Sequence, residues 1–438
     1  MIERALKGGV HPDECKLTAP SPIENFPCPE RLYVPLQQHL GRKARPMVKK
    51  GDVVAKGQKI GEADGFISAN IHSPVAGKVK SIDKVMLPNG VFDDAVVIDV
   101  DQESNSVAEP TWPLKPVDDL TPDDIRTIAR EAGIVGLGGA TFPTAVKLSP
   151  PENVKIDTLI INGAECEPYL TADHRLMLEH TDEVIRGAEL VRRAVGAEKV
   201  FVGIEKNKPD AIKKFDGILK RKDGWEVVAL KSVYPQGAEK NLIKIITGRE
   251  VPVGGLPFNV NVAIQNVGTV YSLYRAASEG IPLIERVVTV SGDGVKKPGN
   301  FRIPFGVMAR EVLEHCEARF GEIEKVIFGG PMMGMSIKGY DVPVIKSTSG
   351  ILCFVKAVRR EPYGCLNCGR CVEVCTLHIA PTRVVKLVRA AKWDEVKKAG
   401  IMNCMECGCC AYVCPSKIPL VQWIRYGKFM LRKMEAQR

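Results

Sequence analysis

The sequence predicts a multidomain protein in which a β-rich domain, an α/β domain with a parallel sheet and a small α+β module precede a helical, cysteine-rich domain. Three observations support this fold class. The 438 residues are too many for one ordinary core. The hydrophobic pattern changes period along the chain, and eight of the 14 cysteines form two tightly spaced groups near the C-terminus. Hydrophobic residues at 45% and charged residues at 26% exclude a mostly disordered or fibrous protein.

Residues 1–115 are predicted to form the β-rich domain. Short alternating runs separated by glycine turns occupy residues 48–61, and a further turn and strand follow at residues 72–79. Short strands at such spacing are typical of a small barrel or sandwich. The proline-rich segment 110–116 is predicted to be the linker out of this domain.

Residues 116–285 are predicted to form the α/β domain. Its first helix has Thr121 as N-cap, Pro122 at the first helical position and acids in the first turn, and we expect it to end at Gly133. Later segments alternate in period, with strands expected at residues 158–161, 200–204 and 225–230 and helices at 171–195 and 209–220. This alternation predicts a parallel sheet covered by helices.

The last two units are smaller. Residues 286–356 are predicted to form an α+β module, with a strand at 286–291, a turn at 296–300 and a short helix at 308–317. Residues 357–438 are predicted to consist of helices and cysteine loops. Within them, residues 382–399 are predicted to form one basic helix, whose charged face is either solvated or a docking surface for acids or lipid headgroups.

The net charge narrows the classes of partner. It is formally +9, and about +5 if eight cysteines become thiolates on two oxidised clusters. A modest basic excess suits an acidic protein, an anionic nucleotide or the cytoplasmic membrane surface, whereas nucleic acid is not expected. The start of the chain has no apolar signal-peptide region, and no stretch approaches the ~18 apolar residues of a membrane span. The chain is therefore expected to be soluble or peripheral.

Eight cysteines repeat one spacing, C-x2-C-x2-C-x3-C, twice. Three closely spaced thiolates on one loop can bind three corners of a [4Fe-4S] cubane, and the fourth ligand then comes from the last cysteine of the other set. The predicted ligands of the two clusters are Cys365, Cys368, Cys371 and Cys414 for one, and Cys404, Cys407, Cys410 and Cys375 for the other. Structural zinc is the alternative, but zinc needs four ligands rather than a doubled three-plus-one pattern. Thr376 departs from the pattern, since proline usually follows the fourth cysteine, and Cys409 is predicted to be packed rather than a ligand.

A glycine loop and several strand ends point to a second site. The loop runs from Gly136 to Thr144, where glycines would let the backbone approach a phosphate or a flat ring, although a tight turn is the alternative. Polar residues lie at the ends of two predicted strands, at 162–168 and 265–269, and a further polar loop at 237–240 directly precedes a predicted helix. Because ligands bind at the carboxyl ends of parallel strands, we expect these loops to converge on one edge of the sheet. Cys166 is predicted to be a buried thiol, because no histidine lies near it in sequence.

These motifs resemble known redox proteins. The stretches GLGGATFPTAVK, INGAECEP, QGAEKNL and QNVGT resemble the FMN- and NADH-binding subunit of respiratory complex I. The whole chain, in order, resembles the C subunits of the Rnf family of membrane-associated ferredoxin:NAD oxidoreductases. GGVHP and GDVVAKGQKIG resemble that family's barrel-sandwich domain, and VTVSGDGVKKPGNFRIPFGV resembles its β-grasp module. The resemblance thus implies a barrel-sandwich domain (1–115), an FMN/NADH-binding α/β domain (116–285), a β-grasp module (286–356) and a two-[4Fe-4S] domain (357–438).

The resemblance also implies roles for single residues. Flavin phosphate or ring would lie on Gly136, Gly138, Gly139 and Lys147. Asn162, Glu165 and Glu239 would hold the isoalloxazine and ribityl chain, and the phosphate would lie at Gln265, Asn266 and Thr269. Phe142 and Glu167 would face the nicotinamide nucleotide. Ala164 and Ala238 depart from the complex I subunit, which has an aspartate and a glutamate there.

The implied function is electron transfer between NAD(H), FMN and two [4Fe-4S] clusters, with ion translocation performed by other subunits. FMN is needed because nicotinamide exchanges electron pairs and a cluster exchanges single electrons. The implied partners are other subunits of a membrane Rnf-type complex and ferredoxin, and the implied location is peripheral, on the cytoplasmic side of the cell membrane. The alternatives are a microcompartment cobalamin reductase and an iron–sulfur carrier with a vestigial flavin site. The barrel also resembles that of a sodium-pumping quinone reductase, but nothing in the sequence places a quinone site.

Overall fold

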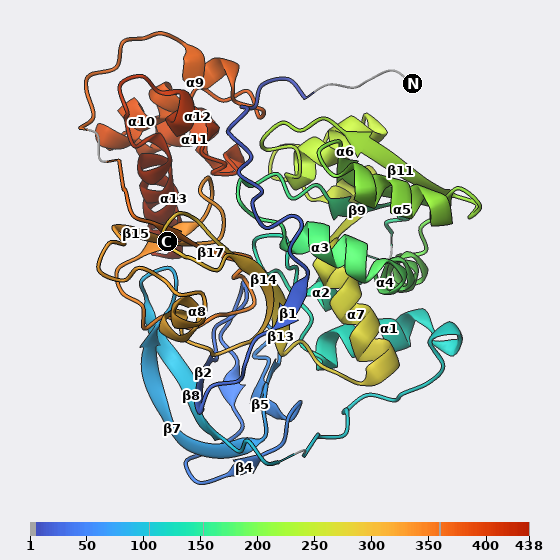
Figure 1. Cartoon of the computed structure of the whole chain (residues 1–438). Helices are drawn as coiled ribbons and strands as arrows, with labels where there is room; N and C mark the ends of the chain where they lie inside the picture. Colours follow the sequence, from blue (N-terminus) through green and yellow to red (C-terminus); the bar gives the residue numbers. More distant parts are fainter. Residues whose placement is uncertain (1–5, 105, 152, 359–360, 438) are drawn as a thin grey trace.

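The computed structural model describes residues 6–104, 106–151, 153–358 and 361–437, and Figure 1 shows their arrangement. Residues 1–4, where the sequence has no apolar run, lie outside this described part. The described strands form four sheets: two small antiparallel ones, one parallel sheet and one mixed sheet. None of the described helices combines the length and the apolar character needed to cross a membrane.

The β-rich domain consists of the two antiparallel sheets, drawn in blue in the lower part of Figure 1. Leu32 and Val34 from one strand and Val96 and Ile98 from its neighbour are fully buried, because alternate side chains of a strand face the core. The strands are β2 (Arg31–Pro35), β8 (Phe92–Val100), β7 (Gly77–Met86) and β4 (Val53–Val54) in the first sheet, and β3 (Arg45–Pro46), β5 (Lys59–Glu62) and β6 (Ile71–His72) in the second.

The α/β domain has the predicted parallel sheet. Its strand order is β11-β10-β9-β12, and every neighbouring pair runs parallel. Thr121 is the N-cap of the first helix, as the sequence predicts, and it forms a reciprocal capping box with Asp124. The strands are β9 (Thr158–Gly163), β10 (Lys199–Glu205), β11 (Trp225–Leu230) and β12 (Val262–Asn266), and the helices are α1 (Pro122–Glu131), α2 (Thr144–Lys147), α3 (Ala172–Glu179), α4 (Thr181–Val195), α5 (Pro209–Leu219), α6 (Glu239–Thr247) and α7 (Val267–Glu279).

The prediction of a single helix over residues 171–195 is wrong. His180 interrupts it with φ −126° and ψ 41°, so that α3 and α4 are separate helices. The His180 ring lies 4.9 Å from the ring of Tyr271, and its Nδ1 lies 3.0 Å from a Glu183 oxygen. Because the chain turns at His180, the N-terminus of α3 can face the end of β9 while α4 packs on α7.

The third module is a six-stranded mixed sheet in the order β1-β14-β13-β17-β15-β16. One of its edges comes from the beginning of the chain, since Ile23 pairs in parallel with Asn300. Residues 23–25 therefore lie outside the β-rich domain with which the sequence groups them. The elements are β1 (Ile23–Asn25), β13 (Glu285–Ser291), β14 (Gly299–Pro304), β15 (Lys325–Phe328), β16 (Met335–Ile337), β17 (Gly350–Phe354) and the helix α8 (Ala309–His315).

The C-terminal domain is helical and has its own core, in which Val384, Val388, Ile424 and Leu431 are buried. The prediction of one basic helix over residues 382–399 is wrong, because Ala391, with a positive φ of 52°, separates two helices. The helices are α9 (Arg370–Glu373), α10 (Pro381–Arg389), α11 (Trp393–Lys398), α12 (Cys409–Val413) and α13 (Leu420–Ala436).

Candidate functional site: a strand-end crevice beside two cysteine quartets

The eight cysteines gather into two quartets, each around its own cavity. Each cavity is lined by three cysteines of one motif and the last cysteine of the other. One cavity, of about 140 Å³, is lined by Cys365, Cys368, Cys371 and Cys414. The other, of about 20 Å³, is lined by Cys375, Cys404, Cys407 and Cys410, and also by Cys409, the residue between two of them. Four sulfur-bearing side chains around a central space are what a cubane cluster requires of its protein.

The two cysteine loops repeat one local geometry. Asn367 and Glu406 both have positive φ, and each donates its backbone N–H to the thiol sulfur two residues earlier, at 3.4 and 3.3 Å. A glycine of positive φ, Gly369 or Gly408, then begins the short helix that carries the third cysteine. Hydrogen bonds to sulfur are among the factors that set cluster potentials.

The loop of the second quartet packs directly on the α/β domain. The Tyr234 hydroxyl donates to the Cys407 carbonyl at 2.7 Å, and the buried Cys409 thiol lies 3.8 Å from the Tyr234 carbonyl. Tyr234 follows β11 and is itself buried. A side chain at Gly408 would come within 2.8 Å of the Met332 carbonyl, so this contact requires glycine.

The glycine loop is an open backbone surface. It closes on itself where the Gly136 N–H donates to the Phe142 carbonyl at 2.9 Å, and the Leu137 N–H donates to the Thr269 hydroxyl at 2.9 Å. Gly138 packs on Asn266, since an added Cβ would lie 3.0 Å from the Asn266 Cβ. An added Cβ at Gly139 would meet no heavy atom of the described chain within 4 Å. This surface fits the close approach of a flat ring or a phosphate.

Two asparagines end neighbouring strands at the same level. Asn162 on β9 is the register partner of Asn266 on β12. The Asn162 amide donates to the Gly237 carbonyl at 2.8 Å, and the Asn266 side chain caps α7 by accepting from the Gly268 N–H at 2.8 Å. Gln265, one residue before, is buried. The polar loops therefore converge in the structure, as the sequence predicts. They are residues 136–144, 162–168, 237–240 and 265–269.

Lys147 and Glu239 meet across this crevice. Their side chains form an ion pair of 2.9 Å between α2 and α6, with 31% and 37% of the side-chain surface exposed. The two residues, 92 positions apart in sequence, thus lie together as the candidate site requires.

Glu165 and Glu167 bind backbone amides rather than the open crevice. The Glu165 carboxylate accepts from Asp173 and His174 at 2.7 and 3.1 Å, which caps α3. The Glu167 carboxylate accepts from Met332 and Met333 at 3.0 and 2.8 Å. Burial raises the pKa of Glu167 to about 7 despite these two donors.

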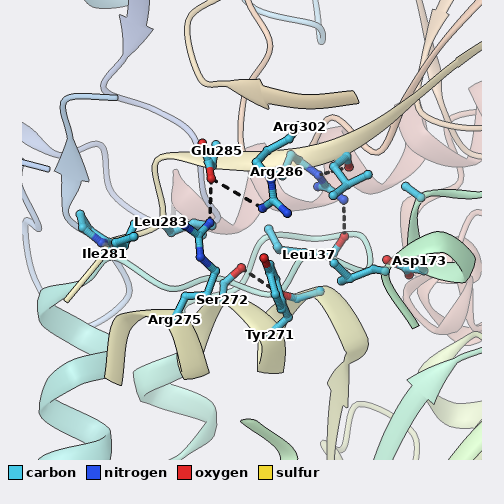
Figure 2. Close-up of a pocket in the computed structure, with 15 residues that line it drawn as sticks. Leu137, Asp173, Tyr271, Ser272, Arg275, Ile281, Leu283, Glu285, Arg286 and Arg302 are labelled. Carbon is cyan, nitrogen blue, oxygen red and sulfur yellow. Dashed lines mark hydrogen bonds and ion pairs between the residues drawn. The ribbon is translucent and has the colours of Figure 1, made fainter. Parts of the chain in front are cut away.

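Two ionisable residues beneath the crevice, the half-buried Asp173 and the buried Arg286, were missed by sequence reasoning. Asp173 accepts from the Asn266 amide at 2.6 Å, and burial together with the Glu165 charge raises the pKa of Asp173 to about 7. Arg286 donates to the Leu137 carbonyl at 3.2 Å, and burial lowers the pKa of Arg286 to about 10. Figure 2 shows Arg286 and Asp173 on either side of Leu137. An arginine at the start of the apolar strand β13 was the available signal for Arg286.

The same close-up shows a small cavity between α7 and β13 that is lined by more arginines (Figure 2). Glu285 binds Arg275 at 2.7 Å and lies 3.6 Å from Arg302. Both guanidiniums also lie within 6 Å of the Tyr271 ring centre. These charges are already paired, so they join α7 to the six-stranded sheet.

Two lysines, the half-buried Lys16 and the buried Lys208, support the loop that follows β9. Lys16 donates to the carbonyls of Glu165, Glu167 and Leu170 at 2.8, 2.9 and 2.5 Å. Lys208 donates to the Ala164 carbonyl at 2.7 Å and to Glu205 at 2.9 Å. Cys166, in the same loop, is half-buried rather than fully buried as predicted, and its pKa is raised to about 12, chiefly by desolvation.

Comparison with known proteins agrees with this geometry. Residues 4–103 match the RnfC barrel sandwich hybrid domain, residues 129–275 the Nuo51 FMN-binding domain, and residues 364–419 the 4Fe-4S dicluster domain. The dicluster match spans all eight cysteines, which decides between iron–sulfur clusters and structural zinc. The chain thus combines an FMN-binding domain with a two-cluster domain.

Relatives match over nearly the whole chain. It is 44% identical over 431 residues to the C subunit of the proton-translocating ferredoxin:NAD(+) oxidoreductase complex of Clostridium ljungdahlii, covering 97% of this chain and 93% of that protein. It is 42% identical over 437 residues to the C subunit of the Na(+)-translocating complex of Acetobacterium woodii, covering 99% and 98%. A solved NAD+-reducing [NiFe]-hydrogenase in the H2-reduced state shares the fold, with a TM-score of 0.51 and 21% identity over 71% of this chain and 62% of that chain. The chain therefore belongs to the RnfC family, the C subunits of ion-translocating oxidoreductase complexes.

Proposed function

We propose that this chain passes electrons between NAD(H), FMN and two [4Fe-4S] clusters as the C subunit of an Rnf-type ferredoxin:NAD oxidoreductase. The observation that carries the proposal is the contact between the two redox regions. The Cys404–Cys410 loop rests on Tyr234 at the end of β11, in the same sheet whose other strand ends form the crevice. The residues that match the FMN-binding and dicluster families lie on the two sides of this contact.

Bound FMN supplies the conversion between the electron pairs of nicotinamide and the single electrons of clusters. The chain's own residues supply placement. The glycine loop at Gly136, Gly138 and Gly139 would lie along the ring or phosphate. The phosphate would lie at the α7 N-terminus, where the first-turn backbone N–H groups and the helix dipole favour an anion. The residues there are Gln265, Asn266 and Thr269.

The remaining crevice residues have separate tasks. Asn162 and Glu239 would hold the isoalloxazine and ribityl chain, and Lys147 would exchange its ion pair with Glu239 for contacts to the flavin. Glu165 fixes α3 and Glu167 fixes the 330–334 loop, so their part in flavin and nucleotide binding is to hold the backbone around the site. Phe142, half-buried in the glycine loop, would face the nicotinamide nucleotide.

The crossed quartets would ligate the clusters. Cys365, Cys368, Cys371 and Cys414 would hold the first, and Cys404, Cys407, Cys410 and Cys375 the second. The six-stranded sheet would serve as the β-grasp-like module of the family. Other subunits of a membrane complex would carry ion translocation, with this chain peripheral on the cytoplasmic side. A microcompartment cobalamin reductase is not favoured, because RnfC-family relatives match over nearly the full length.

Flavin occupancy tests the crevice. Lys147→Ala and Glu239→Ala should each lower the FMN retained per chain several-fold, because each removes a charged group at the mouth of the crevice. The exposed pair Lys155–Glu198, 2.8 Å long, provides the matched control, and Lys155→Ala should retain FMN fully. If the parent chain binds no FMN and NADH does not bleach a flavin absorbance, the carrier with a vestigial flavin site is the correct interpretation.

A further inference from the structure

The two quartets differ in their surroundings. The second is covered by the α/β domain and the 330–334 loop, through the contacts of Cys407, Gly408 and Cys409 described above. The first lies in a loop whose residues 361–364 and 366–370 are all exposed, including Cys368. A cluster held by the second quartet would therefore lie on the side of the α/β domain, and one held by the first quartet would lie beside the exposed loop.

Large apolar side chains surround the outward quartet. Tyr363 is 73% exposed and Leu366 is 70% exposed, although both flank the ligand Cys365. The Tyr363 N–H donates to the Ser416 carbonyl at 2.9 Å, so the segment is held against the loop of Cys414. Exposed aromatic and aliphatic groups on an ordered loop are typical of the centre of an interface.

Cations flank this apolar centre. The buried face of α10 consists of valines, whereas its outer face carries Arg383, Lys386 and Arg389 and no acid. Lys386 reaches the loop itself, with its Nζ 3.3 Å from the Asn367 side-chain oxygen. In the described part of the chain neither Arg383 nor Lys386 forms an ion pair. Arg370 adds a further exposed cation, and the exposed acids of the same segments are Glu361 and Glu373.

We propose that Tyr363, Leu366, Arg370, Arg383 and Lys386 form a docking face for an acidic protein domain that carries a one-electron centre. The inference rests on the proposed function and extends it by giving the electron path an order. The path would run from the flavin crevice to the second quartet, then to the first quartet and then to the docked partner. One electron would cross the face per encounter: the centre held by the first quartet would lose or gain it and the partner's centre would gain or lose it, with no bond or proton exchanged. Small, polar, electrostatically steered contacts are typical of such redox encounters.

Steady-state kinetics test the face. The full chain with both clusters and FMN would oxidise a reduced two-[4Fe-4S] ferredoxin, which is an acidic probe, and NAD+ would accept the electrons. Arg383→Glu/Lys386→Glu should lower kcat/KM for ferredoxin about tenfold and flatten its dependence on salt, because steering by opposite charge is lost. Arg383→Lys/Lys386→Arg keeps both charges and should restore the rate and its salt dependence.

The matched control is Arg432→Glu/Lys433→Glu, which makes the same charge change on exposed residues of α13. Leu420 is at the end of α13 nearer the first quartet, and Arg432 lies roughly 18 Å along the helix from it. This variant should behave as the parent does. NADH-dependent reduction of a small dye should be unchanged in all variants, because it does not need the docking face.

The outcomes separate the two proposals. An absence of NADH-dependent dye reduction in the parent chain overturns the proposed function itself. Normal dye reduction with an unchanged ferredoxin rate in Arg383→Glu/Lys386→Glu overturns the docking face alone. Loss of sedimentation with anionic lipid vesicles in that variant, at an unchanged ferredoxin rate, also overturns it and assigns the cations to a membrane surface instead.

Discussion

Asp173 and Asn266 connect the strand-end crevice to the ionisable groups beneath it. The Asp173 carboxylate accepts from the Asn266 amide at 2.6 Å, and Asn266 in turn caps α7. Burial and the neighbouring Glu165 charge raise the pKa of Asp173 to about 7, far above the value of an unfolded aspartate. The folded chain therefore binds one proton more than the unfolded chain over the interval between the two pKa values.

Asp173→Asn should change how stability depends on pH. In the parent, the Asp173 contribution to the free energy of unfolding is largest below pH 4 and is lost as the pH rises towards 7. The variant keeps an acceptor for Asn266 and does not titrate at this position. The difference in free energy of unfolding, variant minus parent, should therefore be on the order of 2 kcal/mol larger at pH 8 than at pH 5. Urea unfolding of the FMN-free chain at both pH values measures this. An equal difference between parent and variant at the two pH values would contradict the assigned shift.

Arg286→Met should weaken flavin retention. The substitution leaves the Leu137 carbonyl without its buried donor, which costs about 1–3 kcal/mol and loosens the glycine loop. Arg286→Lys keeps a cation and one donor, and it should lose less FMN. Equilibrium dialysis with FMN and with riboflavin separates the causes: a loosened loop weakens both ligands, whereas a purely electrostatic role would weaken only FMN.

The chemistry of each residue type explains which residues of the candidate site could be identified from the sequence. The cysteines were identifiable because spacing alone brings three thiols together on one loop. Glu165 and Glu167 were also singled out, but the roles of their carboxylates were not predictable, because their partners at Asp173 and Met332 depend on how α3 and the 330–334 loop are placed. Asp173 itself has the sequence pattern of an ordinary first-turn acid of a helix.

At the level of elements, the 330–334 loop lies between the flavin crevice and the second quartet. Glu167 holds it from the α/β side, and Gly408 of the cysteine loop packs on its Met332 carbonyl. An added Cβ at Gly330 would come within 2.2 Å of the Glu167 carboxylate, so this glycine is needed for the contact.

Gly330→Ala should slow electron transfer between flavin and clusters while FMN stays bound, because the loop and the cysteine loop that packs on it must both move. We expect a decrease of about tenfold in the rate of cluster reoxidation by NAD+, measured by stopped-flow absorbance. Gly339→Ala, at a position where an added Cβ meets nothing within 4 Å, is the matched control. Equal rates in both variants would show that the loop is not part of the connection.

The boundaries of two helix pairs show where prediction from hydrophobic periodicity fails. The apolar pattern continues through His180 and through Ala391, so each pair of helices is predicted from sequence as a single helix. In the structure, His180 is turned by its contacts with Tyr271 and Glu183, and Ala391 adopts a positive φ. The parallel sheet and the capped start of α1 were predictable, because strand alternation and N-capping are local properties.

At the scale of the whole molecule, the N-terminal segment joins modules that are distant in sequence. The Gly9 N–H donates to the Val374 carbonyl beside the cysteine loops, Val10 pairs with Tyr234, and Lys16 donates to three carbonyls of the loop after β9. Ile23 then pairs with Asn300 in the six-stranded sheet. No local pattern could predict these contacts, since each depends on the placement of another module.

Lys16→Met should therefore affect both redox regions. Three carbonyls in one loop would lose a shared donor, at a cost of about 1–3 kcal/mol for each left unsatisfied. We expect lower FMN retention together with slower reoxidation of the clusters by NAD+. Lys7→Met, on an exposed residue of the same segment, is the control and should change neither property.

The central claim is that NAD(H), the flavin crevice and both quartets form one electron path, and a single-turnover experiment tests it most directly. The chain loaded with FMN and both clusters would be reduced photochemically under anaerobic conditions and then mixed with NAD+. The path predicts that both cluster signals disappear as NADH forms, with one NADH for every two electrons lost, and that FMN-free protein forms none. Clusters that stay reduced in the presence of NAD+, or that reoxidise equally fast without FMN, would contradict it.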